Sequence, residues 1–272
     1  MENKLIILPF DHRSSFLKDI LNKPQKNKAK DMKKMIFEAF LSVAKNNKDF
    51  AILVDEELGS DILINAKELG VKICIPIEKS GQKELKLEFR NNFKEHIDKF
   101  NPDYVKVLVR YNPNNIDINK KQLNVLRKIN QLNYKIILEL LVPPTSKEAS
   151  LPDYDKKARY INTIKAINEI KEVINVNIWK LEGFNKKQWE GIIKNINKES
   201  KIIFLGRGEN KKKVVSWMKS ASHFKEIIGF AIGRTIFLEP LKNYENNKIS
   251  REEAIEIIKK NFIYFIDLWN KN

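Results

Sequence analysis

Cysteine is nearly absent from the sequence, because Cys74 is the only one among 272 residues. One thiol cannot form an intramolecular disulfide and cannot supply the paired ligands of a cysteine metal site, so we expect a reducing compartment, the cytoplasm. Histidine is also scarce: His12, His96 and His223 lie far apart in the chain. A metal site with three imidazole ligands is therefore not expected, and we predict neither a metal ion nor another cofactor.

Long apolar runs are missing as well. No stretch approaches the ~18 unbroken apolar residues of a transmembrane helix. The first apolar run ends at Pro9, too early for the core of a signal peptide. Membrane insertion is therefore not expected. The Gly-x-Gly-x-x-Gly turn that follows the first strand of a dinucleotide-binding sheet is absent too.

Negative charge is under-represented, since the chain has 51 Lys and Arg residues but 35 Asp and Glu residues, which gives a formal charge of +16. Clustered cations would favour a nucleic acid, but these lysines are spread through nearly every polar segment. We therefore do not expect nucleic acid as the main partner. A non-catalytic basic barrel that binds RNA or a protein stays open as the alternative function. A basic field also raises the local concentration of an anionic metabolite such as a phosphorylated sugar.

What the sequence does contain is a regular alternation of short apolar runs and longer polar stretches. The eight apolar runs, rich in β-branched residues, cover residues 5–8, 50–54, 71–75, 104–109, 136–138, 176–179, 202–205 and 227–231. Between them lie stretches with helical spacing, such as 32–43, 123–129 and 160–173. Near-continuous apolar strands are typical of a parallel sheet covered by helices.

Eight such units in 272 residues predict a single domain over residues 1–272, an α/β fold of the (β/α)8 TIM barrel type, which commonly has about 250 residues. A three-layer sandwich is the alternative. Ser250 and Glu253 form a capping-box pattern that predicts a last helix over residues 250–269.

Catalytic side chains of such barrels lie at the carboxyl ends of the strands. In strand order, the polar residues at these places are Asp11, His12, Arg13, Asp55, Glu56, Glu78, Lys106, Arg110, Glu139, Lys180, Glu182, Arg207 and Arg234.

Two of these residues, Lys106 and Lys180, interrupt apolar strands, where an unpaired ammonium group is costly to bury. Either lysine alone is explained as a counter-ion of Glu139 or Glu182. Together they favour a proton-handling cluster, because burial and a neighbouring cation lower the pKa of a lysine until its free amine can attack a carbonyl. The hypothesis is imine formation on one lysine followed by cleavage of a C–C bond, with the second lysine or a carboxylate, Glu139 or Glu182, moving protons. The residues alone do not decide which lysine is the nucleophile.

Phosphate binding has a separate signature. Barrels often hold a phosphate with the loops after the seventh and eighth strands and a helix N-terminus. Gly206 and Arg207 follow the seventh strand, and Gly233 and Arg234 follow the eighth. These glycines let backbone amides approach a phosphate, and arginine adds a charge-assisted contact.

Several motifs also carry a family resemblance over nearly the whole chain. They include Phe10-Asp11-His12-Arg13, Pro76-Ile77-Glu78-Lys79-Ser80-Gly81, Trp179-Lys180-Leu181-Glu182 and Gly229-Phe230-Ala231-Ile232-Gly233-Arg234. The chain resembles the barrel domain at the C-terminus of bacterial 5-dehydro-2-deoxygluconokinase fusions, associated with the 2-deoxy-5-keto-gluconate-6-phosphate aldolase step of myo-inositol breakdown. It is more distantly similar to the class I tagatose-1,6-bisphosphate aldolases.

The resemblance implies a metal-independent class I aldolase, an aldehyde-lyase of carbohydrate metabolism, with dihydroxyacetone phosphate as one product. It selects Lys180 as the imine-forming lysine, with Lys106, Glu139, Asp11 and Glu182 as the other catalytic candidates. The candidate substrate- or phosphate-binding residues, chosen from their positions at the strand ends, are Arg13, Glu56, Glu78, Arg110, Gly206, Arg207, Gly233 and Arg234. The loop 206–209 departs from the inositol family, and assembly into a homo-oligomer stays open.

Overall fold

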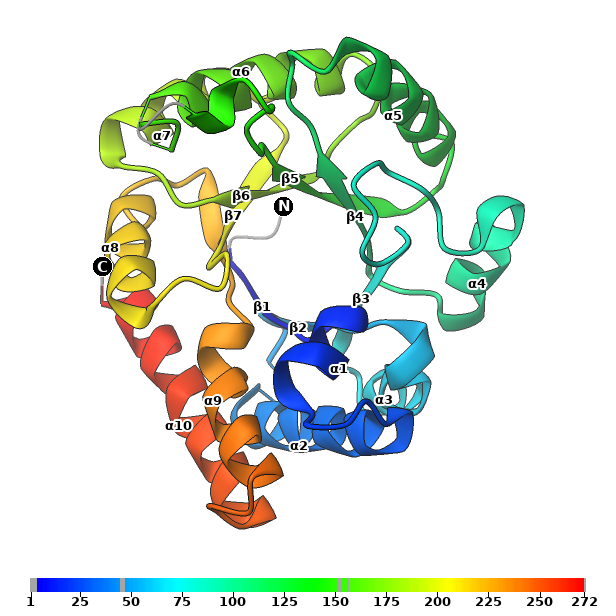
Figure 1. Cartoon of the computed structure of the whole chain (residues 1–272), viewed down its shortest axis with the longest axis vertical. Coiled ribbons are helices and arrows are strands. Elements are labelled where there is room, and N and C mark those ends of the chain that lie inside the picture. Colours follow the sequence, from blue (N-terminus) through cyan, green and yellow to red (C-terminus); the bar gives the residue numbers. More distant parts are fainter. Residues whose placement is uncertain (1–3, 45–46, 151–152, 156, 272) are drawn as a thin grey trace.

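The computed structural model describes residues 4–44, 47–150, 153–155 and 157–271. Parallel strands form a closed barrel in chain order, and the last strand pairs with the first. The prediction of a (β/α)8 barrel is thereby confirmed, and Figure 1 shows the barrel inside its ring of helices. The strands are β1 Leu5–Pro9, β2 Phe50–Leu53, β3 Lys72–Pro76, β4 Tyr104–Arg110, β5 Lys135–Leu141, β6 Ile178–Glu182, β7 Lys201–Leu205 and β8 Ile227–Ala231.

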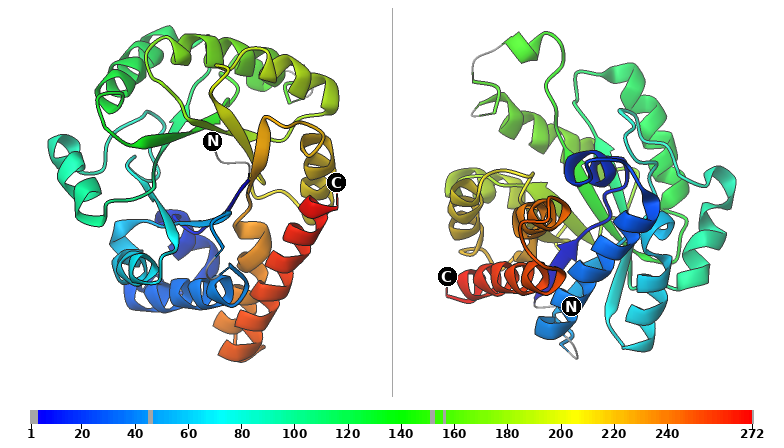
Figure 2. Two further views of the ribbon diagram at one scale, coloured as in Figure 1. Left: turned by 180° about the vertical axis from the view of Figure 1, so that it is seen from behind. Right: turned by 60° about the horizontal axis from the view of Figure 1, so that its bottom comes forward.

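Helices follow the strands and cover the outside of the barrel (Figures 1 and 2). They are α1 Ser14–Ile20, α2 Lys26–Ala44, α3 Glu56–Glu68, α4 Phe93–Phe100, α5 Ile116–Ile129, α6 Ala158–Lys171, α7 Lys186–Ile193, α8 Lys211–Ala221, α9 Arg234–Glu245 and α10 Arg251–Asn270, with short 3-10 turns at Arg90–Asn92 and Glu148–Ser150. The predicted capping box starts α10, because the Ser250 side chain accepts from the Glu253 amide and the Glu253 side chain accepts from the Ser250 amide. α10 packs against both α2 and α9. Of the helices described, none is long and apolar enough to cross a bilayer.

The strands divide the core into two parts because successive side chains point to opposite faces. Inward side chains such as Tyr104, Ile137 and Ile178 fill the barrel, and the outward ones join the larger core beneath the helices. Lys106 and Lys180 each follow an inward residue by two positions, so both point into the barrel. Lys180 lies near the carboxyl end of β6, and Lys106 pairs with Pro76 at the carboxyl end of β3, so both amines lie toward the barrel mouth.

A buried ion pair joins two of the helices. Lys33 of α2 is fully buried and donates to the carboxylate of Asp55, which is also the N-cap of α3 and accepts from the Leu58 amide. Each charge depends on the other, because a lone buried ion has lost its water without gaining a partner.

Removing one charge of this pair is expected to be costly. Lys33→Met leaves the carboxylate of Asp55 buried without its cation, so we expect the free energy of unfolding to fall by roughly 3 kcal/mol in urea titrations. Lys34→Met, at the exposed neighbouring position, is the matched control and should change it by less than about 0.5 kcal/mol. Equal losses in the two variants would contradict a stabilising pair.

Candidate active site

A cavity of about 440 Å³ opens at the carboxyl ends of the strands, a size typical of small-molecule sites. Its wall brings together many of the residues that the sequence places at strand ends. Predicted residues in the wall are Asp11, His12, Arg13, Glu78, Lys106, Arg110, Glu139, Lys180 and Arg234.

Lys106 lies at the centre of a carboxylate cluster. Its Nζ is 3.0 Å from Oδ2 of Asp11, 2.6 Å from Oε1 of Glu78 and 3.1 Å from Oε2 of Glu139. Burial by itself would lower the pKa of Lys106, but the three carboxylates outweigh it and raise the pKa well above its usual value. Lys106 is therefore an ammonium group at neutral pH, and the lowered pKa that burial and a neighbouring cation would give a lysine is not found at this one.

Lys180 has a different environment, although its side chain is almost as buried. Its Nζ donates to Oε2 of Glu139 at 2.8 Å, the same oxygen that Lys106 approaches. β5 and β6 pair Glu139 directly with Lys180, so the sheet register itself makes this contact. One carboxylate thus bridges two lysines, and only one of them is surrounded by further carboxylates.

The carboxylates of the cluster stay ionised. Burial would raise the pKa of Glu139, but Lys106 and Lys180 oppose it and bring the pKa down to about 2. The same balance, led among the cations by Lys106, lowers the pKa of Asp11 well below its usual range. At neutral pH these groups are therefore deprotonated and hold the neighbouring lysine side chains in place.

His12 lines the same cavity next to Asp11. Burial lowers the pKa of its ring to about 4, with Arg234, Lys180 and Lys106 adding to the effect and Asp11 opposing it. The ring is therefore neutral at physiological pH. Its buried Nδ1 has no hydrogen-bond partner within the described parts of the chain.

The start of α9 faces the cavity from the end of β8. Gly233 is the N-cap, and a Cβ at this position would overlap the carbonyl oxygen of Pro9, so only glycine lets the helix approach β1 this closely. Arg234, the first residue of the helix, lines the cavity and donates from Nη2 to the carbonyl oxygen of Arg207 at 3.2 Å. The loops after β7 and β8 are thereby joined.

The whole sequence, residues 1–272, matches the family described as an uncharacterized protein conserved in bacteria, DUF2090. The chain belongs to this family. No curated protein matches the sequence. Among solved structures, Cgl0159 from Corynebacterium glutamicum has a TM-score of 0.61 at 14% identity, over 96% of this chain and 85% of that one.

Two further structures are of aldolases. An archaeal fructose 1,6-bisphosphate aldolase has a TM-score of 0.60 at 13% identity, over 99% of this chain and 95% of that one. A Schiff-base-forming fructose-1,6-bisphosphate aldolase has a TM-score of 0.57 at 13% identity, over 97% and 94%. At such low identity these likenesses establish the shared barrel fold of this DUF2090 member, and the reaction must be argued from the site.

Some predicted residues lie apart from the cavity of this DUF2090 protein. Glu182 does not join the lysines, because its carboxylate turns to Nε of Arg207 at 2.9 Å and Nη1 of Arg159 at 3.5 Å. Arg207 is thereby committed to Glu182 and also to Asp155, at 3.3 Å. Gly206 and Arg207 belong to the β7–α8 loop but not to the cavity wall. The carbonyl oxygen of Arg207 accepts a hydrogen bond from Arg234, so this loop holds the Arg234 side chain in position.

Glu56 is likewise not brought to the barrel mouth. β2 ends at Leu53 and Asp55 caps α3, so Glu56 already stands on the first turn of an outer helix. Its carboxylate binds His96 at 2.8 Å and Lys99 at 3.0 Å. Its predicted role in substrate binding is corrected accordingly.

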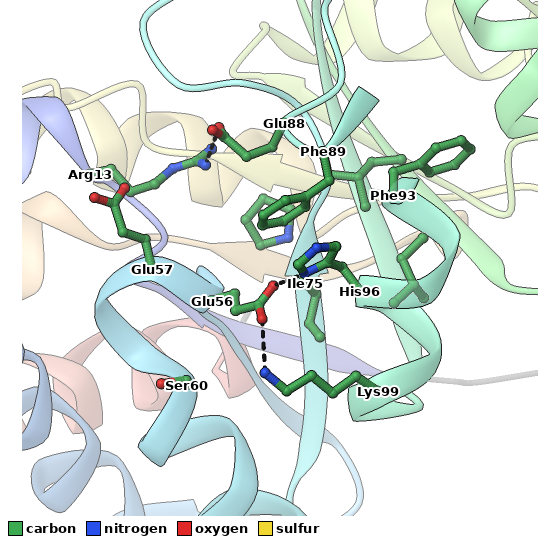
Figure 3. A pocket seen from close by; sticks show the side chains of 13 residues that line it. Arg13, Glu56, Glu57, Ser60, Ile75, Glu88, Phe89, Phe93, His96 and Lys99 are labelled. Carbon is green, nitrogen blue, oxygen red and sulfur yellow. Dashed lines mark hydrogen bonds and ion pairs between the residues drawn. The ribbon is translucent and has the colours of Figure 1, made fainter. Parts of the chain in front are cut away.

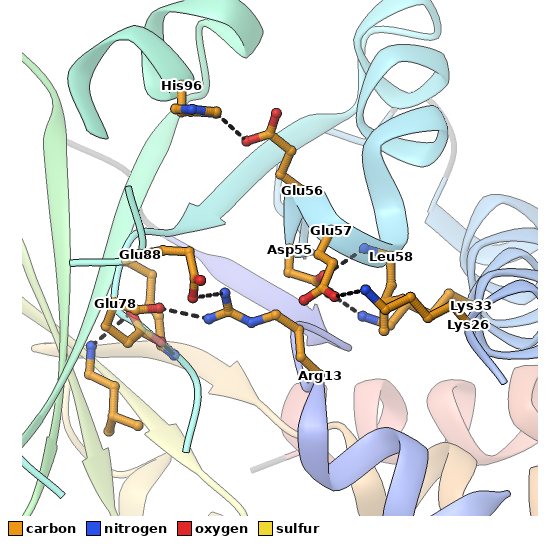
Figure 4. A network of polar contacts seen from close by, with 12 residues as sticks. Arg13, Lys26, Lys33, Asp55, Glu56, Glu57, Leu58, Glu78, Glu88 and His96 are labelled. Carbon is orange, nitrogen blue, oxygen red and sulfur yellow. Dashed lines mark hydrogen bonds and ion pairs between the residues drawn. The ribbon is translucent and has the colours of Figure 1, made fainter. Parts of the chain in front are cut away.

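Other cavity residues were not predicted as site residues. They are Ser14, Ser15, Lys18 and Asp19 from α1, Lys79, Ser80 and Gly81 from the loop after β3, and Leu108 and Leu141 from the strands. Arg13 links α1 to the loop after β3, because Nη1 donates to Glu88 at 2.6 Å and Nη2 to the carbonyl oxygen of Glu78 at 2.7 Å (Figure 4). The residues of α1 and of this loop lie a few positions beyond strand ends in the sequence. Many surface residues lie at similar positions, so the sequence does not single them out.

Proposed function

We propose that this chain is a class I aldolase, an aldehyde-lyase that forms a Schiff base through Lys180 with a phosphorylated ketose or keto sugar acid. The observation that carries the proposal is the pair of inward lysines bridged by Glu139 inside the barrel-mouth cavity. Lys106 is held as an ammonium group by three carboxylates, which leaves Lys180 as the nucleophile.

The proposed reaction passes through an iminium ion and an enamine. The amine of Lys180, after giving up a proton, adds to the substrate ketone, and the carbonyl oxygen leaves as water with uptake of one proton to give an iminium ion. A carboxylate, Glu139 in this proposal, takes the proton of the substrate hydroxyl, and the C–C bond breaks as its electron pair enters the iminium to form an enamine. The aldehyde leaves, the enamine regains the proton held by Glu139, and water hydrolyses the resulting iminium ion to release the ketone and the protonated amine of Lys180.

The other groups of the cluster act without bonding to the substrate carbon. The ammonium of Lys106 fixes Glu139, Glu78 and Asp11, and its positive charge stabilises negative charge that develops on substrate oxygens. The neutral ring of His12 is placed to hydrogen-bond a substrate oxygen.

A phosphate group fits the start of α9. The first N–H groups of a helix point outward and carry partial positive charge, which suits an anion, and Arg234 adds a guanidinium at the same place. Lys18, Lys79 and Arg110 make the rest of the wall basic. We propose a substrate such as 2-deoxy-5-keto-gluconate 6-phosphate or a ketose bisphosphate, with dihydroxyacetone phosphate as one product. Two structures that share this barrel fold are fructose-1,6-bisphosphate aldolases, which supports this substrate class.

Imine trapping tests the proposal directly. The protein is incubated with dihydroxyacetone phosphate and borohydride, digested and examined by peptide mass spectrometry. We expect a reduced adduct on the peptide that carries Lys180. Complete absence of adduct with every phosphoketose tried, together with steep salt-dependent retention on RNA, would instead favour the non-catalytic basic barrel. A cytoplasmic location and a homo-oligomeric assembly stay predictions.

Arg234 provides a separate prediction. Replacing Arg234 by glutamine removes one charge-assisted contact to the phosphate, so we expect KM for a phosphorylated substrate to rise about tenfold to a hundredfold while kcat changes less. Steady-state kinetics measure both. Arg127→Gln, an exposed arginine on α5, is the control and should leave KM unchanged. A loss of the same size with an unphosphorylated analogue would argue against phosphate binding by Arg234.

A further inference from the structure

A second cavity, of about 490 Å³, lies outside the barrel wall between α3 and α4 (Figure 3). We name it the side cavity. Its apolar lining consists of Ile75, Pro76, Ile77, Phe89, Phe93 and Ile97. The ring of His96 stacks on Phe89 with centroids 3.4 Å apart and forms a flat wall. A cavity of this size with an apolar lining suits a small organic molecule rather than an ion.

The polar end of the side cavity carries both signs of charge. Arg13 lies there with the carboxylates of Glu57 and Glu88, as Figure 3 shows. Glu57 pairs only with Lys26 among the described residues, and both side chains are largely exposed, so a ligand can replace this weak contact. Glu88 uses Oε2 for Arg13, which leaves Oε1 without a hydrogen bond to any residue that the structure describes.

Arg13 is the independent sign that something binds here. Its side chain is 8% exposed, and Nε is buried without a hydrogen-bond partner in the described chain. Buried donors are rarely left unsatisfied in proteins. An acceptor on a ligand would reach Nε only if the guanidinium group turned toward the cavity, with the ligand replacing contacts to Glu88 and to the carbonyl of Glu78.

The Arg13–Glu88 pair also restricts the charge of the ligand. An amine that bound Glu88 would leave the guanidinium of Arg13, which is 8% exposed, without its carboxylate, and this loss is costly. An acid that bound Arg13 would leave Glu88, which is 28% exposed, without its cation, at a smaller cost. A zwitterion can insert between them, carboxylate to Arg13 and ammonium to Glu88 and Glu57, so that every charge keeps a partner. We propose that the side cavity binds a free amino acid with an apolar side chain.

The apolar side chain of that amino acid would lie over Ile75, Ile77 and Phe93. Phosphorylated sugars fit poorly, since three carboxylates, Glu56, Glu57 and Glu88, outnumber the two permanent cations of the lining, Arg13 and Lys99. The barrel-mouth cavity has the opposite preference, with its lysines and arginines. The two ligands therefore occupy separate places on either side of Arg13, and the proposal does not depend on the aldolase activity.

Calorimetric titration with three matched probes tests the charge argument. L-phenylalanine is the zwitterion, phenethylamine carries only the ammonium, and 3-phenylpropionate carries only the carboxylate. We expect L-phenylalanine to bind at least about tenfold more tightly than either singly charged probe. The proposal is overturned if L-phenylalanine shows no saturable binding at millimolar concentration, or if phenethylamine binds as tightly, which would indicate a site for organic cations.

Two variants test the location. Glu88→Gln removes the partner of the ammonium and should weaken L-phenylalanine binding at least about tenfold, whereas Glu95→Gln, an exposed residue of α4 outside the cavity, should not. Ser60→Phe places a ring inside the cavity and should abolish binding, which keeps the test decisive if Glu88→Gln fails to fold. Unchanged affinity in either folded variant overturns the proposal. Imine trapping at Lys180, measured in parallel, separates this outcome from a failure of the proposed aldolase.

Discussion

Replacing Lys180 by methionine is expected to abolish imine trapping and to lower kcat for aldol cleavage by at least roughly a thousandfold. The amine is the only group of this residue that can bond to the substrate carbon, and methionine keeps the length of the side chain without a nucleophile. Removal of a covalent nucleophile commonly costs more than removal of a binding contact, because the whole covalent pathway disappears. Borohydride trapping and a coupled aldehyde assay measure the two effects.

The control for this variant is Lys201→Met. Lys201 also belongs to a barrel strand, but it starts β7 at the opposite end of the barrel from the cavity. We expect its trapping and kcat to match those of the unchanged protein. If the Lys180 variant kept an adduct on another lysine and most of its activity, the nucleophile would have to be reassigned.

The barrel was predictable because its signal is repeated. Each strand is a near-continuous apolar run, and the pairing of neighbours along the chain needs no information from distant residues. Only the bounds differ: the fifth run was predicted at 136–138, and β5 extends over Lys135–Leu141. The extension includes Glu139, whose inward direction follows from its position two residues after Ile137.

The site was predictable only where strand periodicity decides it. Lys106 and Lys180 point inward for that reason, and the register brings Glu139 to Lys180. The charge state of Lys106 was not predictable, because it depends on two carboxylates that approach its Nζ to within about 3 Å. They belong to Asp11 and Glu78, which lie just beyond the ends of β1 and β3. Contacts at this range are set by the tilt of the barrel and by loop packing, neither of which can be deduced from spacing along the chain.

Glu182 illustrates the same limit. It follows Lys180 by two residues, so periodicity alone would place it in the lysine cluster. β6 ends at this residue, and beyond a strand end the side chain direction depends on its partners. Here these are Arg159 of α6 and Arg207 of the β7–α8 loop. A carboxylate next to two guanidinium groups pairs with them, and this pairing keeps it from the substrate.

Glu139→Gln should combine a loss of activity with a change in the pH dependence of stability. The carboxylate moves a proton in the proposed reaction, so kcat should fall about a hundredfold to ten-thousandfold. Glu172→Gln, an exposed glutamate after α6, is the control for a charge change of the same size. If Glu139→Gln kept an activity close to that of the unchanged protein, another group would have to move the proton.

The stability effect has a definite sign. The pKa of Glu139 falls from the ordinary value of 4.5 to about 2 on folding, because Lys106 and Lys180 outweigh its burial. A lowered pKa means that the ionised carboxylate stabilises the fold above pH 4.5, by an amount on the order of 3 kcal/mol, and that this contribution is lost as the pH falls toward 2. The unchanged protein should therefore exceed Glu139→Gln in free energy of unfolding at neutral pH, and the difference should shrink between pH 4.5 and 2. A difference that stays constant across this range in urea titrations would mean that the lysines do not hold Glu139 ionised. The bridge between Lys106 and Lys180, on which the choice of nucleophile depends, would then lose its electrostatic basis.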